Sequence, residues 1–142
     1  MSLPEKNSSQ EKKNKTLVES FVEEIFNKHN LSATENYLNP VAGKGSGEFK
    51  EFLSAFFKAF PDWHANIEQI VAEDNLVVIF LNGSGTHQGE FQGMPPTRKP
   101  VNIRSADLYR IENGIIVEHR DVVDQIEFVA TNRHNSLICN NV

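Results

Sequence analysis

Two apolar stretches in the C-terminal third of the chain carry the ionisable residues that could do chemistry. His119 and Asp121 occupy alternate positions within residues 115–123, where the other odd positions are Ile or Val, and Ser105 and Asp107 alternate in the same way one stretch earlier. An apolar strand face that carries a few ionisable groups is typical of the wall of a ligand pocket. Because desolvation moves a carboxylate towards the range useful for acid–base chemistry, we expect Asp121 to be catalytic, with His119 and Asp107 coupled to it.

The turn between these stretches decides which polar side chains face one another. Residues 112–114 read Glu-Asn-Gly, which predicts a β-hairpin. If Gly114 forms a bulge, Asp107 faces His119. A plain two-residue loop shifts the pairing by one residue and puts Asp107 beside Arg120. We favour the first register, because it gathers the polar groups on one face of the sheet.

Each of these groups also has an interpretation without catalysis. Asp121 could be a surface carboxylate paired with Arg104 or Arg120, and His119 could be a sheet histidine with satisfied hydrogen bonds. A metal site built on His119 and Asp121 would need further ligands that the sequence does not identify, so we predict no metal.

Hydrophobic periodicity predicts the elements that must position these groups. Apolar residues recur at helical spacing in the N-terminal half, and after Pro61 the pattern changes to alternation interrupted by turn signals. The predicted helices cover residues 13–29, 32–38 and 47–60, and the predicted strands cover residues 64–72, 76–87, 100–111 and 115–126. Helices followed by an antiparallel meander indicate an α+β fold, with about three helices packed on one face of a curved, mainly antiparallel sheet of four or more strands.

The third predicted helix is rich in phenylalanine, with Phe49, Phe52, Phe56, Phe57 and Phe60 on its apolar face. Such a face could lie over a cavity as a lid, or it could be a wide contact with the core. We expect the core contact. The glycines at 43–47 lack a preceding strand and the full phosphate-loop spacing, so they predict a loop without a nucleotide site.

Length and charge limit the class of protein. A chain of 142 residues fits one domain, which we place at 13–130, between a disordered tail at 1–12 and a C-terminal tail at 131–142. A net charge of −5 and a pI of about 5.5 make nucleic acid an unexpected partner. We find no stretch of the about 20 apolar residues that span a membrane and no apolar N-terminal segment, which predicts a cytoplasmic protein. Cys139 has no cysteine partner and is interpreted as a tail thiol.

Three segments together resemble one known family. They are residues 60–64 (FPDWH), residues 85–97 (GTHQGEFQGMPPT) and residues 110–124 (RIENGIIVEHRDVVD). Over roughly residues 15 to 128, the chain resembles the SnoaL-like polyketide cyclases, a family within the nuclear-transport-factor-2-like (NTF2-like) superfamily.

This resemblance implies a cone-shaped fold with a deep apolar cavity, no cofactor, and a homodimer or homotetramer formed through the outer face of the sheet. It implies an intramolecular aldol ring closure of a polyketide-like ester, in which an aspartate of the last strand, matching Asp121, is the general acid/base. A small apolar carbonyl ligand is the expected partner. The residues expected to hold it are Ser105, Phe56, Phe60, Trp63, His87, Phe91 and Tyr109.

The chain departs from the family pattern near the expected site. Arg120 stands where a Trp is usual, Asp107 where the cyclases have a His, Ser105 where they have a polar amide, and Arg98 where a Gly is usual. Three functions therefore stay open: a cofactor-free acid–base enzyme, a non-catalytic ligand-binding or dimerisation module, and an isomerase or hydrolase that uses Asp121 with Asp107 as a carboxylate pair.

Overall fold

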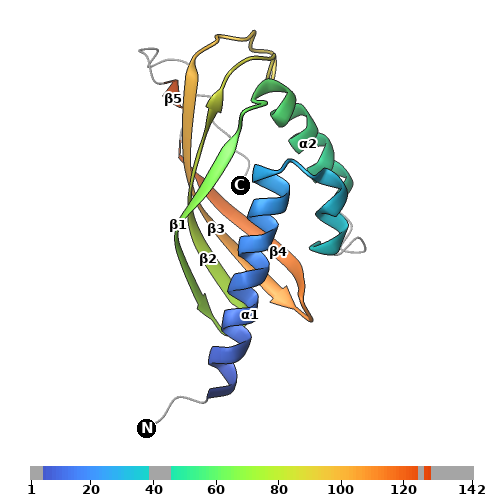
Figure 1. Cartoon of the computed structure of the whole chain (residues 1–142), viewed down its shortest axis with the longest axis vertical. Helices are drawn as coiled ribbons and strands as arrows, with labels where there is room; N and C mark the ends of the chain where they lie inside the picture. The colour runs from blue at the N-terminus through green and yellow to red at the C-terminus, as the bar shows by residue number, and fades with distance from the viewer. Residues whose placement is uncertain (1–4, 39–45, 125–126, 129–142) are drawn as a thin grey trace.

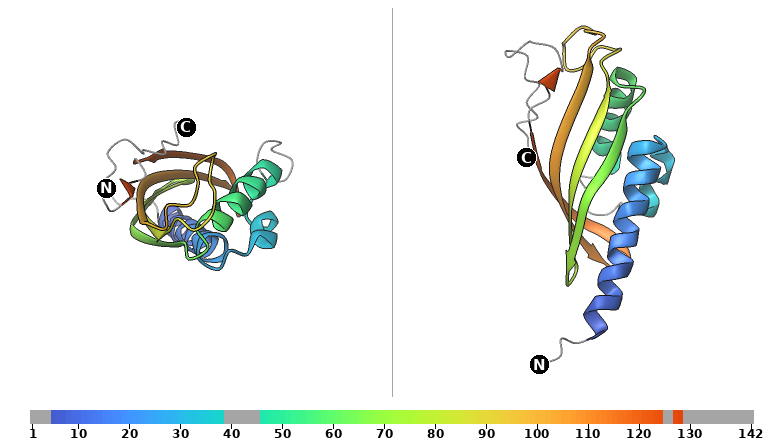
Figure 2. Two further views of the ribbon diagram at one scale, coloured as in Figure 1. Left: turned by 90° about the horizontal axis from the view of Figure 1, so that it is seen from above. Right: turned by 60° about the vertical axis from the view of Figure 1, so that its left-hand side comes forward.

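Helical elements cover the concave face of a curved sheet in the computed structural model, which describes residues 5–38, 46–124 and 127–128 (Figure 1, Figure 2). The helical elements are α1 (Glu5–Phe21), the π-helical turn η1 (Val22–Asn27), the 3₁₀ helix η2 (Leu31–Asn36) and α2 (Ser46–Ala59). The strands are β1 (His64–Glu73), β2 (Leu76–Thr86), β3 (Pro100–Glu112), β4 (Ile115–Val123) and the short β5 (Glu127–Phe128). The predicted α+β fold class is confirmed.

α1 and η1 follow one another without a break along the concave face (Figure 1). Val18, Phe21, Val22 and Ile25 share their apolar side and are each at most 2% exposed. The helix begins at Glu5, so residues 5–12, predicted to lie in a disordered tail, are helical instead. Glu, Lys and Gln are good helix formers and this segment contains neither Gly nor Pro, so the helix extends beyond its buried face.

The sheet has the strand order β1-β2-β3-β4, with every neighbouring pair antiparallel and β5 paired to the start of β3. The four long strands begin at His64, Leu76, Pro100 and Ile115, as predicted. The side chain of Asn27 ties η1 to the edge strand β1. It accepts from the backbone N–H of Ala65 at 2.7 Å and donates to the carbonyl of Ala65 at 3.0 Å.

The two faces of the sheet have different surroundings. The side that faces the helices is buried and carries Val77, Ile79, Leu81, Val101, Tyr109 and Ile111. The opposite face carries Val71, Phe80 and Val122, which are each half exposed or more. Among the described residues, no helix is both long and apolar enough to cross a bilayer. The glycine-rich stretch up to Gly45, the tail at 131–142 and Cys139 lie outside the described residues.

The pairing of β3 with β4 differs from the favoured prediction. Asp107 lies opposite Asp121, and Tyr109 lies opposite His119. The predicted pairing of Asp107 with His119 is therefore wrong by two residues. Because two residues are one full period of a strand, the polar side chains still lie on one face, as the prediction required.

A bulge within β4 accounts for this register. Asn113 and Gly114 have φ angles of 52° and 74°, the left-handed conformation of a two-residue hairpin turn. The strands first pair as a plain two-residue loop requires, and Val117 then enters β4 as an extra residue opposite no single partner. The bulge lies at Val117 rather than at Gly114. This extra residue places Asp107 opposite Asp121, whereas the short turn alone would have placed it opposite Arg120.

Trp63 lies directly on the backbone of β2, where two glycines leave room for its indole. A Cβ at Gly83 would lie 2.0 Å from Cζ2 of Trp63, and one at Gly85 would lie 3.2 Å from its Cε3. Trp63 is buried and packs edge-on against Phe56, with ring centroids 4.8 Å apart. The absence of a side chain at position 83 is thus a packing requirement of this end of the core.

We predict that Gly83→Ala lowers the free energy of unfolding by about 1–3 kcal/mol, the usual effect of adding a methyl group to filled space. The measurement is urea unfolding followed by circular dichroism. Gly47→Ala is the control, since nothing lies within 4 Å of a Cβ at that position. Equal stability of Gly83→Ala and the wild type would contradict the contact with Trp63.

Candidate functional site

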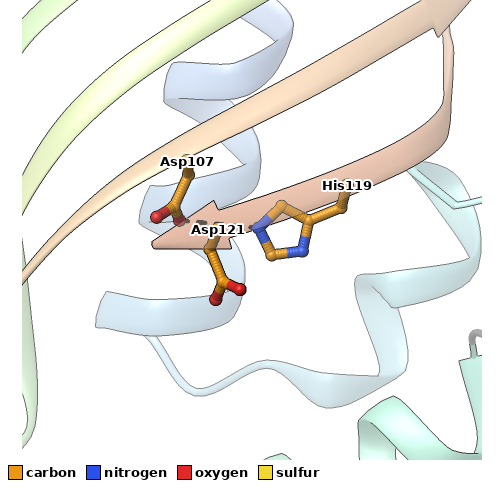
Figure 3. A group of neighbouring side chains, drawn as sticks. All are labelled: Asp107, His119 and Asp121. Atoms are coloured by element: carbon orange, nitrogen blue, oxygen red, sulfur yellow. Dashed lines mark ion pairs between the residues drawn. The ribbon is translucent and has the colours of Figure 1, made fainter. Parts of the chain in front are cut away.

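Three ionisable side chains from the paired strands β3 and β4 converge near the helical layer (Figure 3). Asp107, His119 and Asp121 each offer a nitrogen or oxygen atom, and these atoms all lie within 4.8 Å of one another. His119 Nε2 lies 3.6 Å from Asp107 Oδ2. The structure therefore brings together all three residues predicted to be catalytic.

Asp107 is the buried member of this cluster, with 5% of its surface exposed. The Tyr109 hydroxyl donates a hydrogen bond to its Oδ2 at 3.2 Å. Its Oδ1 is buried and accepts no hydrogen bond from the part of the chain that the structure describes. Burying a carboxylate oxygen without a donor is unfavourable, which makes Asp107 an unusual group to find in the core of a sheet.

Asp121 is half-buried at the same level of the sheet. Desolvation raises the pKa of Asp121 above its ordinary value, the positive charge available to His119 lowers it, and the negative charge of Asp107 raises it further. The net direction is upward. Asp121 is thus a carboxyl group that holds a proton more readily than an exposed aspartate, as expected of a group used in proton transfer.

Tyr109 lies below the two strands with only 1% of its surface exposed. Its ring stacks on the imidazole of His119, with centroids 4.7 Å apart and planes within 5°. Burial and the neighbouring Asp107 raise the pKa of Tyr109 well above its usual value of 10.0, so the phenol keeps its proton. Tyr109 was predicted to hold substrate, but its hydroxyl is bonded to Asp107.

Ser105 lies on the same face of β3 as Asp107, one strand period away, opposite Leu81 on one side and Val123 on the other. It is half-buried. Its position at the edge of the cluster is compatible with its predicted contact with a ligand.

The other residues predicted to bind substrate form a separate aromatic cluster, defined as Phe56, Phe60, Trp63, His87 and Phe91. The four carbocyclic or indole members pack against one another at centroid distances of 4.8–6.2 Å. All five are buried. Gly83, which Trp63 covers, pairs with Ile103, four residues or about 13 Å along β3 from Asp107. The structure does not bring this cluster next to Asp107.

His87 anchors the loop between β2 and β3 to the aromatic cluster. Its ring stacks on Phe60 at 5.3 Å, and its Nδ1 accepts the backbone N–H of Thr97 at 3.2 Å. Burial lowers the pKa of His87. A neutral imidazole that accepts a backbone hydrogen bond is a loop anchor, so the Gly-Thr-His motif has a structural use in this chain.

Phe21 is a supporting residue that sequence reasoning did not single out. It packs edge-on against Tyr109 from α1, with ring centroids 5.8 Å apart. The only sequence signal was its place in an amphipathic helix, which is shared by many core residues. That signal predicts burial and cannot indicate which side chain of the sheet it meets.

The cluster of Asp107, His119 and Asp121 also has the donor types of a metal site. One imidazole nitrogen and two carboxylate oxygens suit borderline divalent ions. Asp107 is the third ligand that the sequence did not identify. However, the donor atoms spread over up to 4.8 Å, whereas ligands of a tetrahedral ion with bonds of about 2.1 Å lie about 3.4 Å apart. Asp107 Oδ2 is also already bonded to Tyr109. The present geometry fits shared protons better than a metal ion.

Sequence comparison identifies the family to which this chain belongs. The family model described as SnoaL-like polyketide cyclase matches residues 16–131. The chain is therefore a member of the SnoaL-like polyketide cyclase family, and the predicted resemblance is confirmed. No curated protein matches the chain.

Solved structures support the same family. AclR from Streptomyces galilaeus, a proposed hydroxylase, is 28% identical with a TM-score of 0.72, covering 80% of this chain and 90% of its own. IdmH from Streptomyces antibioticus, a proposed polyketide cyclase, is 25% identical with a TM-score of 0.66, covering 78% and 91%. A proposed polyketide cyclase from Acidithiobacillus ferrooxidans, 22% identical with a TM-score of 0.69 and covering 87% and 92%, shows the same fold.

The upward pKa shift of Asp121 predicts a stability effect. The folded-state pKa exceeds the unfolded one, so between the two values the folded protein binds more protons and stability falls as the pH rises. Asp121→Asn removes the ionised carboxylate. We expect its melting temperature at pH 7 to equal or exceed that of the wild type, with the difference disappearing near about pH 3, where both states are protonated.

Calorimetry at the two pH values tests this expectation. Glu68→Gln, an exposed carboxylate on β1, is the matched control and should leave the melting temperature unchanged at both. A loss of several degrees in Asp121→Asn at pH 7 would instead mean that the carboxylate stabilises the fold.

Proposed function

We propose that this protein is a cofactor-free acid–base enzyme that acts on an apolar carbonyl compound, with Asp121 as the group that takes and returns the proton. The observation that carries the proposal is the cluster of Asp107, His119 and Asp121 on the helix-facing side of the sheet. Membership of the SnoaL-like polyketide cyclase family supports it.

The accessibility of the three side chains supports their separate roles. Asp107 is almost fully buried and is bonded to Tyr109, so it is poorly placed to touch a ligand. Asp121 is half-buried, and the side chain of His119 is 30% exposed. A ligand that approaches the cluster would therefore meet His119 and Asp121, with Asp107 beneath them.

The proposed reaction starts with ionised Asp121. Its carboxylate removes a proton from the carbon next to a ketone or ester carbonyl, and an N–H of His119 donates to the enolate oxygen that forms. In an aldol ring closure, the enolate carbon then bonds to a second carbonyl carbon of the same molecule. The resulting alkoxide takes the proton back from Asp121, which restores the carboxylate. Holding the two ends of the ligand together would supply much of the acceleration.

A carboxylate pair is a second candidate, because Asp107 and Asp121 are direct neighbours across the β3–β4 pairing. Two carboxyl groups so placed resist simultaneous ionisation, which favours one protonated and one ionised partner. An isomerase would use the same first proton transfer and return the proton to a different carbon. A hydrolase would instead activate water with the ionised member. The products of the three reactions differ in mass or in ring count.

We predict that the protein accelerates hydrogen–deuterium exchange next to the carbonyl of an apolar ketone, for which 2-tetralone is the probe. Asp121→Asn should reduce the catalysed rate by about 10²–10⁴-fold, the usual contribution of a positioned acid/base. Proton NMR in deuterated buffer measures the loss of the C–H signal without requiring the natural substrate.

Asp124→Asn is the control for this exchange, because Asp124 is an exposed carboxylate three residues from Asp121 and pairs with Arg104. It should exchange at the wild-type rate. Equal rates for Asp121→Asn and the wild type would assign the proton transfer to another group. Retention of an unmodified apolar ligand, seen by mass spectrometry of the purified protein, together with no exchange would favour the ligand-binding module.

We also propose that the outer face of the sheet forms a homodimer. Phe80, Ala106 and Val122 line a groove of about 530 Å³ on this face. Phe80 is 52% and Val122 is 69% exposed, an unusual cost for large apolar side chains that stay in water. Arg104 and Asp124 pair with each other at the rim, so the charges beside the groove are balanced and do not repel a second copy.

We predict that Val122→Asp converts a dimer to a monomer, because it places a charge at the most exposed apolar position of this face. Sedimentation velocity at a fixed concentration gives the mass. Phe52→Lys is the control: Phe52 is 44% exposed but belongs to α2, on the other side of the sheet. A wild-type protein that sediments as a monomer would refute the interface.

A further inference from the structure

One buried side chain touches two of the three members of the candidate site. Tyr109 donates its phenol hydrogen bond to Asp107 Oδ2 at 3.2 Å. The same ring lies flat against His119, with centroids 4.7 Å apart and planes within 5°. His119 Nε2 is in turn 3.6 Å from the oxygen that accepts the phenol. The Tyr109 hydroxyl and His119 Nε2 therefore both lie near the same oxygen atom, Oδ2 of Asp107.

The position of Tyr109 in the sheet enforces both contacts. It lies directly opposite His119 across the β3–β4 pairing, and it follows Asp107 by one strand period on the same face. Phe21 of α1 packs against the ring from the helical side. Tyr109 is 1% exposed, so it is enclosed on the side away from the strands and does not present its hydroxyl to a ligand.

We propose that Tyr109 is a positioning residue that orients His119 and neutralises part of the charge of Asp107, and thereby sets the proton affinity of Asp121. The functional part of this inference rests on the acid–base role of Asp121 proposed above. Its electrostatic part concerns only groups that are in contact and can be tested without a substrate.

The hydrogen bond to Asp107 is the element that acts on Asp121. Asp107 raises the pKa of Asp121 through its negative charge, and a phenol donor draws part of that charge towards itself. The phenol stays protonated, since burial and the charge of Asp107 raise its own pKa well above 10.0. It is thus a permanent donor across the range in which enzymes operate.

Within the part of the chain that the structure describes, three titratable groups act on Tyr109. Asp107 accepts its hydrogen bond, His119 stacks on its ring, and the charge of Asp121 raises its pKa. On its β2 side it pairs with Val77, and on the α1 side it meets Phe21. Neither of these two residues carries a charge at any pH.

The test compares Tyr109→Phe with Tyr37→Phe. Tyr37 is the other tyrosine of the chain, and its ring also packs against Phe21, at 5.5 Å. Each variant loses one hydroxyl and keeps its ring. The first readout is a carbon-13 NMR titration of the Asp121 carboxyl group, assigned with Asp121→Asn. The second is the pH dependence of the ketone exchange described above.

In Tyr109→Phe, the full charge of Asp107 acts on Asp121. We expect the pKa of Asp121 to rise by about 0.5–1 unit, and the acid limb of the exchange profile to move up by the same amount. The rate at saturating ketone should fall about tenfold with KM unchanged, because the residue does not touch the ligand. Tyr37→Phe should match the wild type in both readouts.

An Asp121 pKa that stays within about 0.2 unit of the wild type, or falls, in a folded Tyr109→Phe variant overturns the proposal. A melting temperature lowered equally by both variants, with unchanged titrations, would show that Tyr109 is structural only. If the pKa rises but the wild type catalyses no exchange, the acid–base function fails while the coupling stands. If Tyr109→Phe is unfolded, 3-fluorotyrosine is incorporated into Tyr37→Phe, where Tyr109 is the remaining tyrosine. Its more acidic phenol is a stronger donor to Asp107, so an Asp121 pKa that does not fall overturns the proposal.

Discussion

The register between β3 and β4 is the constraint on which the candidate site depends. Successive side chains of a strand point to opposite faces of the sheet. Asp107 and Asp121 therefore share a face only if the pairing of β3 with β4 places odd-numbered residues opposite odd-numbered residues. The tight Asn113-Gly114 turn alone would pair odd-numbered residues of β3 with even-numbered residues of β4. The extra residue at Val117 corrects it. A local irregularity of the backbone, far simpler than any active-site constellation, thus determines whether ionisable groups share a face with the core or lie in solvent.

The helical layer covers the face of the sheet on which the register places the ionisable side chains. α1 and η1 cover the concave face, and Asn27 binds them to the edge of the sheet through both polar groups of one backbone residue. Phe21 then reaches Tyr109, which in turn meets His119. The first two contacts join the helical layer to the sheet, and the third joins two neighbouring strands within the sheet. The low exposure of Asp107 and the proton affinity of Asp121 both result from the cover that this layer provides.

The sequence predicted the elements well because their signals are local. Strand starts at His64, Leu76, Pro100 and Ile115 follow from alternation and turn residues, and the shared face of His119 and Asp121 follows from alternation within one strand. The place of Asp107 on that face depends on the register between β3 and β4. Cross-strand partners were not predictable in the same way, because they depend on the bulge at Val117, which no turn residue in the sequence marks. The start of α1 was missed because helix propensity, rather than an apolar face, extends it. The stack of Tyr109 on His119 depended on the corrected register.

The sequence pattern also did not predict what the residues of the aromatic cluster contact. A run of phenylalanines predicts an apolar face but does not say whether a ligand or another ring will fill the space beside it. In this structure Phe56 meets Phe60, Trp63 and Phe91. These partners of Phe56 lie in the link between α2 and β1 and in the loop after β2. The ionisable cluster instead comes from one hairpin of fifteen residues, 107–121. The aromatic cluster and the ionisable cluster are thus encoded in separate parts of the chain. A substitution among the aromatic residues can therefore change the packing at that end of the core while the hairpin that carries Asp107, His119 and Asp121 keeps its sequence.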